Sequence, residues 1–206
     1  MNGQPHGRGK MTYTQRADLD AKDQEYTSSN CTSYDGYWRH GRRSGTGKVT
    51  WSAGTRYRGK HYGNRMSGHG KLSYINGDIY EGDFVDDKIC GRGKLTEAGG
   101  DVYEGEYVDG QAHGYGIMIY ASGSKYEGEW SEGAMHGQGT MTYIDGGVYE
   151  GEWVYNTSTG YGAMTYGNGD VYEGWWKDNR FHGKGKLVKA NGQVEKGLWQ
   201  DGVLRD

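Results

Sequence analysis

A pattern of 23 residues occurs in seven complete copies without an insertion, and this period constrains the fold more than any other feature of the chain. The clearest copy is Tyr126–Val148, which reads YEGEWSEGAMHGQGTMTYIDGGV. A fixed period of this length indicates a repeat architecture, in which each copy packs mainly against its neighbours. The copies start at Tyr34, Tyr57, Tyr80, Tyr103, Tyr126, Tyr149 and Tyr172, and an incomplete copy starts at Glu195.

Four glycines hold the same places in every complete copy. With the first tyrosine as position 1, they lie at positions 3, 12, 14 and 21, so the seven copies contain 28 of the 40 glycines. Disordered chains contain few aromatic residues, and collagen needs glycine at every third position with abundant proline. This chain has 19 Tyr, 7 Trp and one proline. The composition therefore predicts tight turns and aromatic rings packed against bare backbone.

Each copy alternates with a period of two residues in two segments. In the first segment Tyr126, Gly128 and Trp130 point to one face, and the glutamates between them point to the other. The segment Gly137–Tyr143 alternates in the same way, and turn-like residues follow each segment. Each copy is therefore expected to be a β-hairpin. We predict an all-β fold, a single-layer antiparallel meander of hairpins with a thin aromatic core on the glycine-bearing face.

The repeat register divides the chain into four parts. Residues 1–13 read as an N-terminal half repeat, 14–33 as a polar insertion loop, 34–194 as seven full repeats and 195–206 as a C-terminal half repeat. The loop contains several acidic residues, and a short helix or a regulatory role within it stays open. The two half repeats are either frayed ends or complementary strands that pair chains end to end, because an unpaired sheet edge invites such pairing.

The run Tyr-Glu-Gly-Glu-Trp followed by His-Gly-x-Gly resembles the MORN repeat (membrane occupation and recognition nexus). The resemblance covers residues 34–206 and, in part, residues 6–13. It implies an elongated, twisted single sheet and a scaffolding role at cytoskeletal structures, cilia and flagella (including the axoneme), cell-division machinery or membrane junctions. It also implies a link to phospholipids. The sequence departs from the family pattern at Arg58, Lys60, His61, Thr159 and Trp175.

Three motifs that could carry chemistry are better explained by the repeat. The Gly-x-Gly-Lys stretches, such as Gly45–Lys48, lack the remaining residues of a P-loop. Glutamate pairs such as Glu127 and Glu129 recur in successive copies, whereas catalysis needs one distinctive pocket. One column holds His6, His113, His136, His182 and Cys90. Successive copies lie about 9.6 Å apart at about 4.8 Å per strand, too far to share a metal ion within one sheet. A site formed between two chains stays open, with Cys90 and His113 as its first candidates. We therefore expect no enzyme activity, no cofactor and no metal.

Charge is unevenly distributed although the net charge is only −3. Residues 34–74 hold nine Lys or Arg and one acid, and residues 78–176 hold eighteen acids and four bases. Such asymmetry favours oriented association with a partner. The basic cluster is a candidate patch for anionic phospholipid or for an acidic protein such as tubulin, with a merely solvated face as the alternative. It comprises Arg39, Arg42, Arg43, Lys48, Arg56, Arg58, Lys60 and Arg65.

The aromatic face is the second candidate surface, as a groove for an extended peptide or an amphipathic helix. Its alternative role is simply the core. The candidate residues are Tyr103, Tyr107, Trp130, Tyr143, Trp153, Tyr166 and Trp176. With two cysteines and no signal-like or membrane-spanning run, we expect a cytoplasmic scaffold that binds proteins at a cytoskeletal or ciliary assembly. The alternative is a peripheral phospholipid-binding protein that uses the basic repeats. No nucleic-acid partner is expected.

Overall fold

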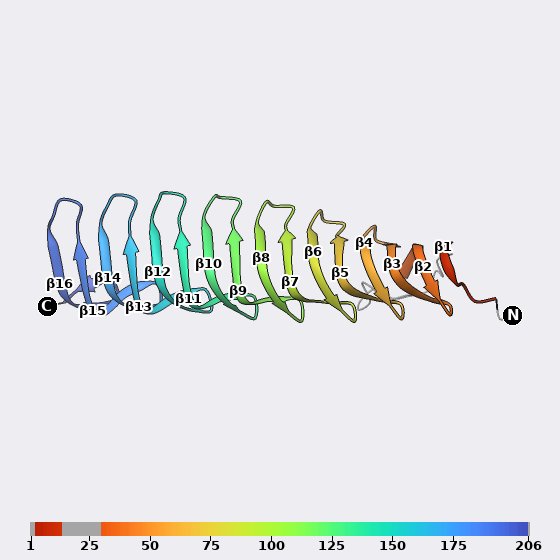
Figure 1. Cartoon of the computed structure of the whole chain (residues 1–206). Coiled ribbons are helices and arrows are strands. Elements are labelled where there is room, and N and C mark those ends of the chain that lie inside the picture. The colour runs from red at the N-terminus through yellow and green to blue at the C-terminus, as the bar shows by residue number, and fades with distance from the viewer. Residues whose placement is uncertain (1–2, 14–29, 206) are drawn as a thin grey trace. The chain divides into compact units, whose positions relative to one another are not determined.

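The protein, described here by a computed structural model, folds as an open antiparallel meander, with seventeen β-strands among the residues that the structure describes (Figure 1). The structure describes residues 3–13 and 30–205. Every strand pair for which the register is recorded joins strands that are consecutive in the sequence. The predicted all-β meander of repeated hairpins is therefore confirmed.

The chain divides into two units, which we describe separately. The N-terminal unit comprises Met1–Gly99 and Tyr107–Gly110, and the C-terminal unit comprises Gly100–Glu106 and Gln111–Asp206. The strands before the division are β1 Gly7–Thr12, β2 Cys31–Arg39, β3 Arg42–Trp51, β4 Arg56–Tyr62, β5 Arg65–Ser73, β6 Ile79–Val85 and β7 Lys88–Thr96. The division passes through β8 Val102–Val108. The strands after it are β9 Gln111–Ile119, β10 Lys125–Ser131, β11 Ala134–Thr142, β12 Val148–Val154, β13 Thr157–Thr165, β14 Val171–Lys177, β15 Arg180–Val188, β16 Val194–Gln200 and β17 Val203–Leu204.

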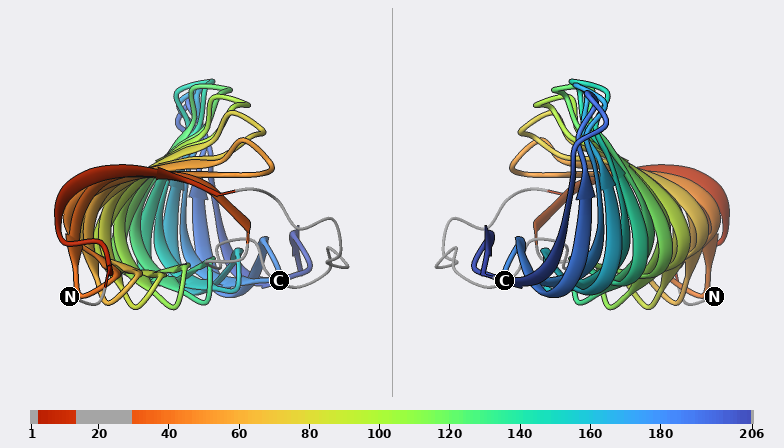
Figure 2. Two further views of the ribbon diagram at one scale, coloured as in Figure 1. Left: turned by 90° about the vertical axis from the view of Figure 1, so that its right-hand side faces the viewer. Right: turned by 90° about the vertical axis from the view of Figure 1, so that its left-hand side faces the viewer.

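The hairpin register brings the glycines of each repeat together. In the β10–β11 hairpin Gly128 lies opposite Gly139, and the register shifts between Gly128 and Trp130. The position-12 glycine beside this shift, Gly137, has a φ of 61°, a left-handed conformation that glycine adopts without a steric penalty. A β-bulge of this kind bends the strand and increases its twist. Within each unit the successive hairpins line up one behind the next (Figure 2).

In the N-terminal unit the core is a single file of aromatic rings. The position-1 tyrosines Tyr34, Tyr57 and Tyr80 are fully buried. Between them lie the position-5 rings, which meet the tyrosines edge to face at centroid separations of 4.9–5.3 Å. Such geometry is favoured between aromatic rings. The position-5 residues of this unit are Trp38, His61, Phe84 and Tyr107.

The C-terminal unit repeats this file with tryptophan at position 5. Trp130, Trp153, Trp176 and Trp199 meet the position-1 tyrosines edge to face at 5.0–5.6 Å. Each indole Nε1 also donates a hydrogen bond to the carbonyl oxygen of the position-14 glycine in the preceding repeat, at 3.1–3.2 Å. These bonds join neighbouring repeats as well as neighbouring rings.

The glycines of positions 3 and 14 make room for the tyrosine rings. A Cβ atom at Gly139 would lie 2.5 Å from Cζ of Tyr126, and one at Gly128 would lie 2.5 Å from Cα of Gly139. Each position-1 hydroxyl reaches across this slot and donates to the carbonyl oxygen of position 4 in its own repeat, at 3.0–3.3 Å. Burial raises the pKa of these tyrosines, that of Tyr103 to about 12, so the hydroxyls stay protonated and donate.

The hairpin turns tie each repeat to the one before it. The position-8 residue has positive φ, for example 66° at Asn156. Its backbone nitrogen donates to the carbonyl oxygen of Met135 at 3.0 Å, and its Oδ1 accepts from the nitrogen of Met135 at 2.9 Å. Asn64, Asp87 and Asn179 accept in the same way. Where position 8 is glycine, as at Gly133, only the backbone bond remains.

Two details at the ends of the repeat array differ from the expectation. The predicted insertion loop, residues 14–33, lies mostly outside the described residues, but Cys31–Ser33 belong to β2. Ser33 pairs with Thr12 of β1, which extends the ladder beyond the repeat boundary. The C-terminal half repeat also has more than its first strand, because β17 pairs with β16 through Val203 and Leu204.

Candidate interaction surface

The face opposite the tyrosine file, which we call the outer face, carries the side chains that the core leaves unused. Strand alternation points positions 1, 3 and 5 inward and positions 2 and 4 outward. In the β10–β12 region the outer face shows Glu127, Glu129, Glu150 and Glu152, all exposed or half-buried. The second strand of each hairpin adds positions 13 and 15 to the same two rows. The chemistry of this face therefore changes from repeat to repeat while the core stays the same.

In the N-terminal unit the outer face carries a basic row, defined as Lys48, Arg58 and Lys71. Lys48 lies opposite Arg58, and Arg58 lies opposite Lys71, on three successive strands. All three side chains are exposed. Lys71 also lies 3.5 Å from a carboxylate oxygen of Glu81. The cross-strand register thus aligns cations that are 10 and 13 residues apart in the sequence.

The predicted basic patch is only partly present, because Arg43 is not at the surface. Arg43 is 5% exposed. It occupies position 10, which holds the buried Met66 and Met135 in other repeats. Its Nη2 donates to the carbonyl oxygen of Asn64, and its guanidinium carbon lies 5.9 Å from the centre of the Tyr34 ring. The other predicted members, Arg39, Arg42, Lys48, Arg56, Arg58, Lys60 and Arg65, are exposed.

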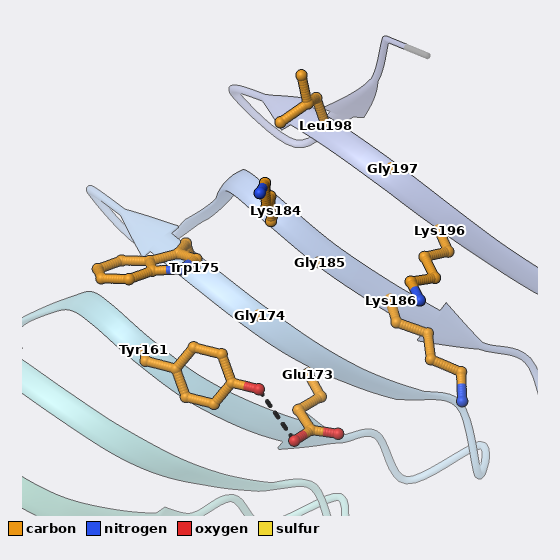
Figure 3. Close-up of a pocket in the computed structure, with 10 residues that line it drawn as sticks. All are labelled: Tyr161, Glu173, Gly174, Trp175, Lys184, Gly185, Lys186, Lys196, Gly197 and Leu198. Carbon is orange, nitrogen blue, oxygen red and sulfur yellow. Dashed lines mark hydrogen bonds between the residues drawn. The ribbon is translucent and has the colours of Figure 1, made fainter.

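In the C-terminal unit the outer face contains a hollow of about 450 Å³ over β13–β16 (Figure 3). Its floor is the backbone of Gly174, Gly185 and Gly197, which lie opposite one another on three successive strands. One side is formed by Tyr161, Trp175, Lys184 and Leu198, and the other by Glu173, Lys186 and Lys196. We call these ten residues the hollow.

The register explains how the hollow is built. Tyr161 lies opposite Trp175, and Lys184 lies opposite Leu198. Gly183, at φ 63°, takes the left-handed conformation of the bulge, and a Cβ on it would lie 3.3 Å from Cβ of Trp175. In Figure 3 the Trp175 indole lies on one side of the hollow, and Tyr161 points to Glu173 on the other side.

A hydrogen bond closes one end of the hollow. Tyr161 donates to Oε1 of Glu173 at 3.0 Å, and this bond raises the pKa of Tyr161. Glu173 lies opposite Lys186 in the register but forms no ion pair with it. Across residues 3–13 and 30–205, the structure records no ion pair for Lys184, Lys186 or Lys196. The hollow thus offers ammonium donors beside aromatic and aliphatic surface.

The predicted aromatic groove is used mainly as core. Tyr103, Tyr107, Trp130, Trp153 and Trp176 are all buried, which assigns these rings to the core instead of to a partner surface. The remaining two candidates follow the second strands of their hairpins, where Tyr143 is exposed and Tyr166 half-buried. Tyr143 donates its backbone N–H to Gly147, and Tyr166 to Asp170.

Two further observations concern possible ligands and membranes. Among the described residues, no group of three or more His, Cys, Asp or Glu side chains is arranged to hold a metal ion. Within the same ranges no helix is long and apolar enough to cross a membrane. Cys31 is buried and Cys90 half-buried, and neither forms a disulfide.

Several solved structures resemble the chain at low sequence identity. The TCP domain of Drosophila melanogaster SAS-4 (dCPAP), solved with a proline-rich motif of Ana2 (dSTIL), is 14% identical with a TM-score of 0.47, over 75% of this chain and 84% of that one. The TCP10 domain of Danio rerio CPAP is 14% identical with a TM-score of 0.31, over 75% and 73%. Virginiamycin B lyase of Staphylococcus aureus is 12% identical with a TM-score of 0.20, over 73% and 68%.

No curated protein matches the chain in sequence. The MORN repeat, in contrast, matches residues 1–15 and then seven consecutive segments of 23 residues from 34–56 to 172–194. The segment boundaries coincide with the repeat starts at the buried tyrosines. The glycine slots, the aromatic file and these matches have one explanation: the chain belongs to the MORN-repeat family.

Proposed function

We propose that this protein is a non-catalytic scaffold that binds other proteins through its outer face, at a cytoskeletal or ciliary assembly in the cytoplasm. The observation that carries the proposal is that one face of the sheet forms the core and the other face is exposed. The residues at the inward positions pack in the aromatic core, whereas the outer face presents exposed charges in rows that differ between repeats. A surface of this kind is suited to recognising a partner along several repeats.

The family supports the non-catalytic part of the proposal, since MORN repeats form a non-enzymatic repeat module. Two places on the outer face are the strongest candidates for contact, namely the basic row of the N-terminal unit and the hollow of the C-terminal unit. Both concentrate exposed cations, which attract an acidic partner and accelerate its association. Attachment to a cytoskeletal or ciliary assembly is the part of the proposal that rests on family membership.

The experiment is detergent extraction of ciliated cells that express the tagged chain. We expect the protein to stay with the insoluble cytoskeletal fraction and to be released when the basic row and the hollow are reversed together by Lys48→Glu, Arg58→Glu, Lys184→Glu and Lys186→Glu. The control reverses four exposed cations outside the basic patch and the hollow, Arg8→Glu, Lys10→Glu, Lys177→Glu and Arg205→Glu, and should leave retention intact. Complete extraction of the unaltered protein would refute the proposal.

Anionic phospholipid is the second candidate ligand, and the basic row favours it. Each lysine or arginine near an anionic bilayer contributes about 1 kcal/mol to binding, so three aligned cations are a credible membrane contact. Vesicles of phosphatidylcholine and phosphatidylserine should then sediment the protein, and Lys48→Glu with Arg58→Glu should release it. Arg43 is unsuitable for this test because it is buried. An absence of sedimentation with the unaltered protein eliminates the lipid function.

A further inference from the structure

We infer that the hollow of the C-terminal unit binds an extended acidic segment of a partner protein, in which an aromatic or aliphatic side chain lies between carboxylates. This inference deepens the proposed function and rests on it, because it names the chemistry of a partner for one part of the outer face. It is carried by the shape, the charge and the exposed apolar surface of the hollow.

The shape suits a chain segment that lies flat on the sheet. The floor consists of backbone at Gly174, Gly185 and Gly197, and side chains rise on both sides of it (Figure 3). The trough therefore runs across β14, β15 and β16, a distance of about 10 Å at about 4.8 Å per strand. An extended peptide in this trough turns alternate side chains toward opposite walls.

The charge suits carboxylates. Lys186 and Lys196 lie directly opposite each other on neighbouring strands, a like-charge pairing that destabilises a sheet. Some lysines elsewhere on the molecule are paired with an acid, as Lys125 is with Glu127 and Lys88 with Asp109. The lysines of the hollow have no such ion pair among the described residues. A ligand with two or more carboxylates would relieve the repulsion between Lys186 and Lys196.

The apolar surface suits one aromatic or aliphatic side chain between those carboxylates. Tyr161, Trp175 and Leu198 are each 52% exposed. They lie in the row with Lys184, so that apolar contact and an ammonium group are available on the same wall. Tryptophan and tyrosine contribute strongly to protein interfaces because they provide large, rigid contact areas.

The surroundings of the hollow favour a peptide over a lipid bilayer. The outer face of the same unit carries Glu127, Glu129, Glu150 and Glu152, all exposed or half-buried. A flat anionic membrane that touched Lys184 and Lys186 would also meet these carboxylates, which it repels. A narrow peptide that occupies only the trough avoids them. We therefore assign a protein segment, and treat vesicle binding through the lysines of the hollow as the result that overturns the assignment.

The test is fluorescence anisotropy of a labelled Glu-Glu-Phe-Glu-Glu peptide titrated with the full chain. We expect saturable binding that weakens as salt is added, because exposed charge pairs are screened. Lys184→Glu with Lys186→Glu should lower the affinity by at least about tenfold, and Trp175→Ala by about fivefold. The matched control, Lys125→Glu with Lys177→Glu, makes the same change in net charge outside the hollow and should change the affinity by less than about twofold.

Two companion peptides separate the contributions, with Gln replacing every Glu in one and Gly replacing Phe in the other. Both should bind more weakly than the parent peptide. The inference is overturned if the parent peptide does not bind, if the control variant loses as much affinity as the hollow variant, or if the hollow variant loses binding to phosphatidylserine vesicles and not to the peptide. Cytoskeletal retention of the Lys184→Glu, Lys186→Glu variant in ciliated cells then distinguishes failure of this inference from failure of the proposed function.

Discussion

The close approach of the Tyr126 ring to the backbone of Gly139 leads to the sharpest prediction. Gly139→Ala places a Cβ atom 2.5 Å from Cζ and 2.6 Å from Cε2 of Tyr126. The φ of Gly139 is not positive, so the alanine backbone itself is unstrained and the effect is purely steric. The ring has no free space to move into, because it is fully buried and meets Trp130 at 5.2 Å and Trp153 at 5.5 Å.

The expected cost follows from overpacking and from the displaced hydroxyl. Inserting a methyl group into a packed core costs about 1–3 kcal/mol, and loss of the hydrogen bond from Tyr126 to the carbonyl oxygen of Glu129 adds about 1 kcal/mol. We therefore expect Gly139→Ala to lower the free energy of unfolding by about 2–4 kcal/mol, as measured by urea denaturation with far-UV circular dichroism.

A double-mutant cycle identifies the cause. Tyr126→Ala removes the ring and costs about 3–5 kcal/mol alone, but it also vacates the space that the new Cβ needs. The double variant should therefore be about as stable as Tyr126→Ala alone, a coupling of about 2 kcal/mol or more. Gly146→Ala is the matched control, because Gly146 has φ 85° and open space around its Cβ. Its backbone cost of about 1–2 kcal/mol should add to the cost of Tyr126→Ala in the double variant. If the costs of Gly139→Ala and Tyr126→Ala were also additive, the steric conflict between the Gly139 Cβ and the Tyr126 ring would be refuted.

Three further predictions concern individual departures and ties within the repeats. His61 is buried, and its pKa is lowered from 6.5 to about 4, mainly by burial and further by the charge of Arg43. As the pH falls, the unfolded chain therefore binds a proton at this histidine before the folded chain does. The free energy of unfolding should fall by about 3 kcal/mol as the pH drops from 6.5 to 4. His61→Phe, which copies Phe84 of the next repeat, should lose this dependence in denaturation curves recorded at both pH values. Trp153→Phe removes the hydrogen bond to Gly139 and should cost about 1 kcal/mol, whereas an unchanged midpoint would show that the bond between repeats is unimportant. Asn156→Ala should destabilise more than Asn156→Gly in thermal melts, because both lose the bond from Met135 but only alanine is strained at φ 66°.

The repeat period was sufficient to predict the hairpins and the inward positions, because glycine and tyrosine recur where the steric demand is strictest. A ring that lies against bare backbone leaves no tolerance for a Cβ, so the glycine columns are readable in a single sequence. The same argument could have located Arg43 correctly. Position 10 holds Met66 and Met135 in other repeats, and this column indicates an inward side chain although the residue itself is charged.

The hollow was harder to predict, because it depends on pairing between strands. Trp175 was recognisable as a departure from glutamate, and Gly183–Lys186 reads GKGK, which places Lys184 and Lys186 on one face. Their alignment with Lys196 and Leu198 follows only once the β15–β16 register is known. Five of the seven groove candidates lie in the core for a related reason: the rings that point inward also contact each other, and a single-layer sheet has no other residues with which to build its core.

The hydrogen bonds from each hairpin turn to the preceding repeat have a consequence for how the molecule comes apart. Met135 is held by Asn156, and Ser158 by Asn179, each from a turn 21 residues later. When a repeat opens at the C-terminal end, the preceding repeat loses these hydrogen bonds. Opening should therefore spread from the C-terminal end inward, one hairpin at a time. Hydrogen-exchange protection would then decrease stepwise from repeat to repeat along the C-terminal unit and be lowest at β16 and β17. A partner bound across β13–β16 would stabilise the hairpins that open first and raise their hydrogen-exchange protection.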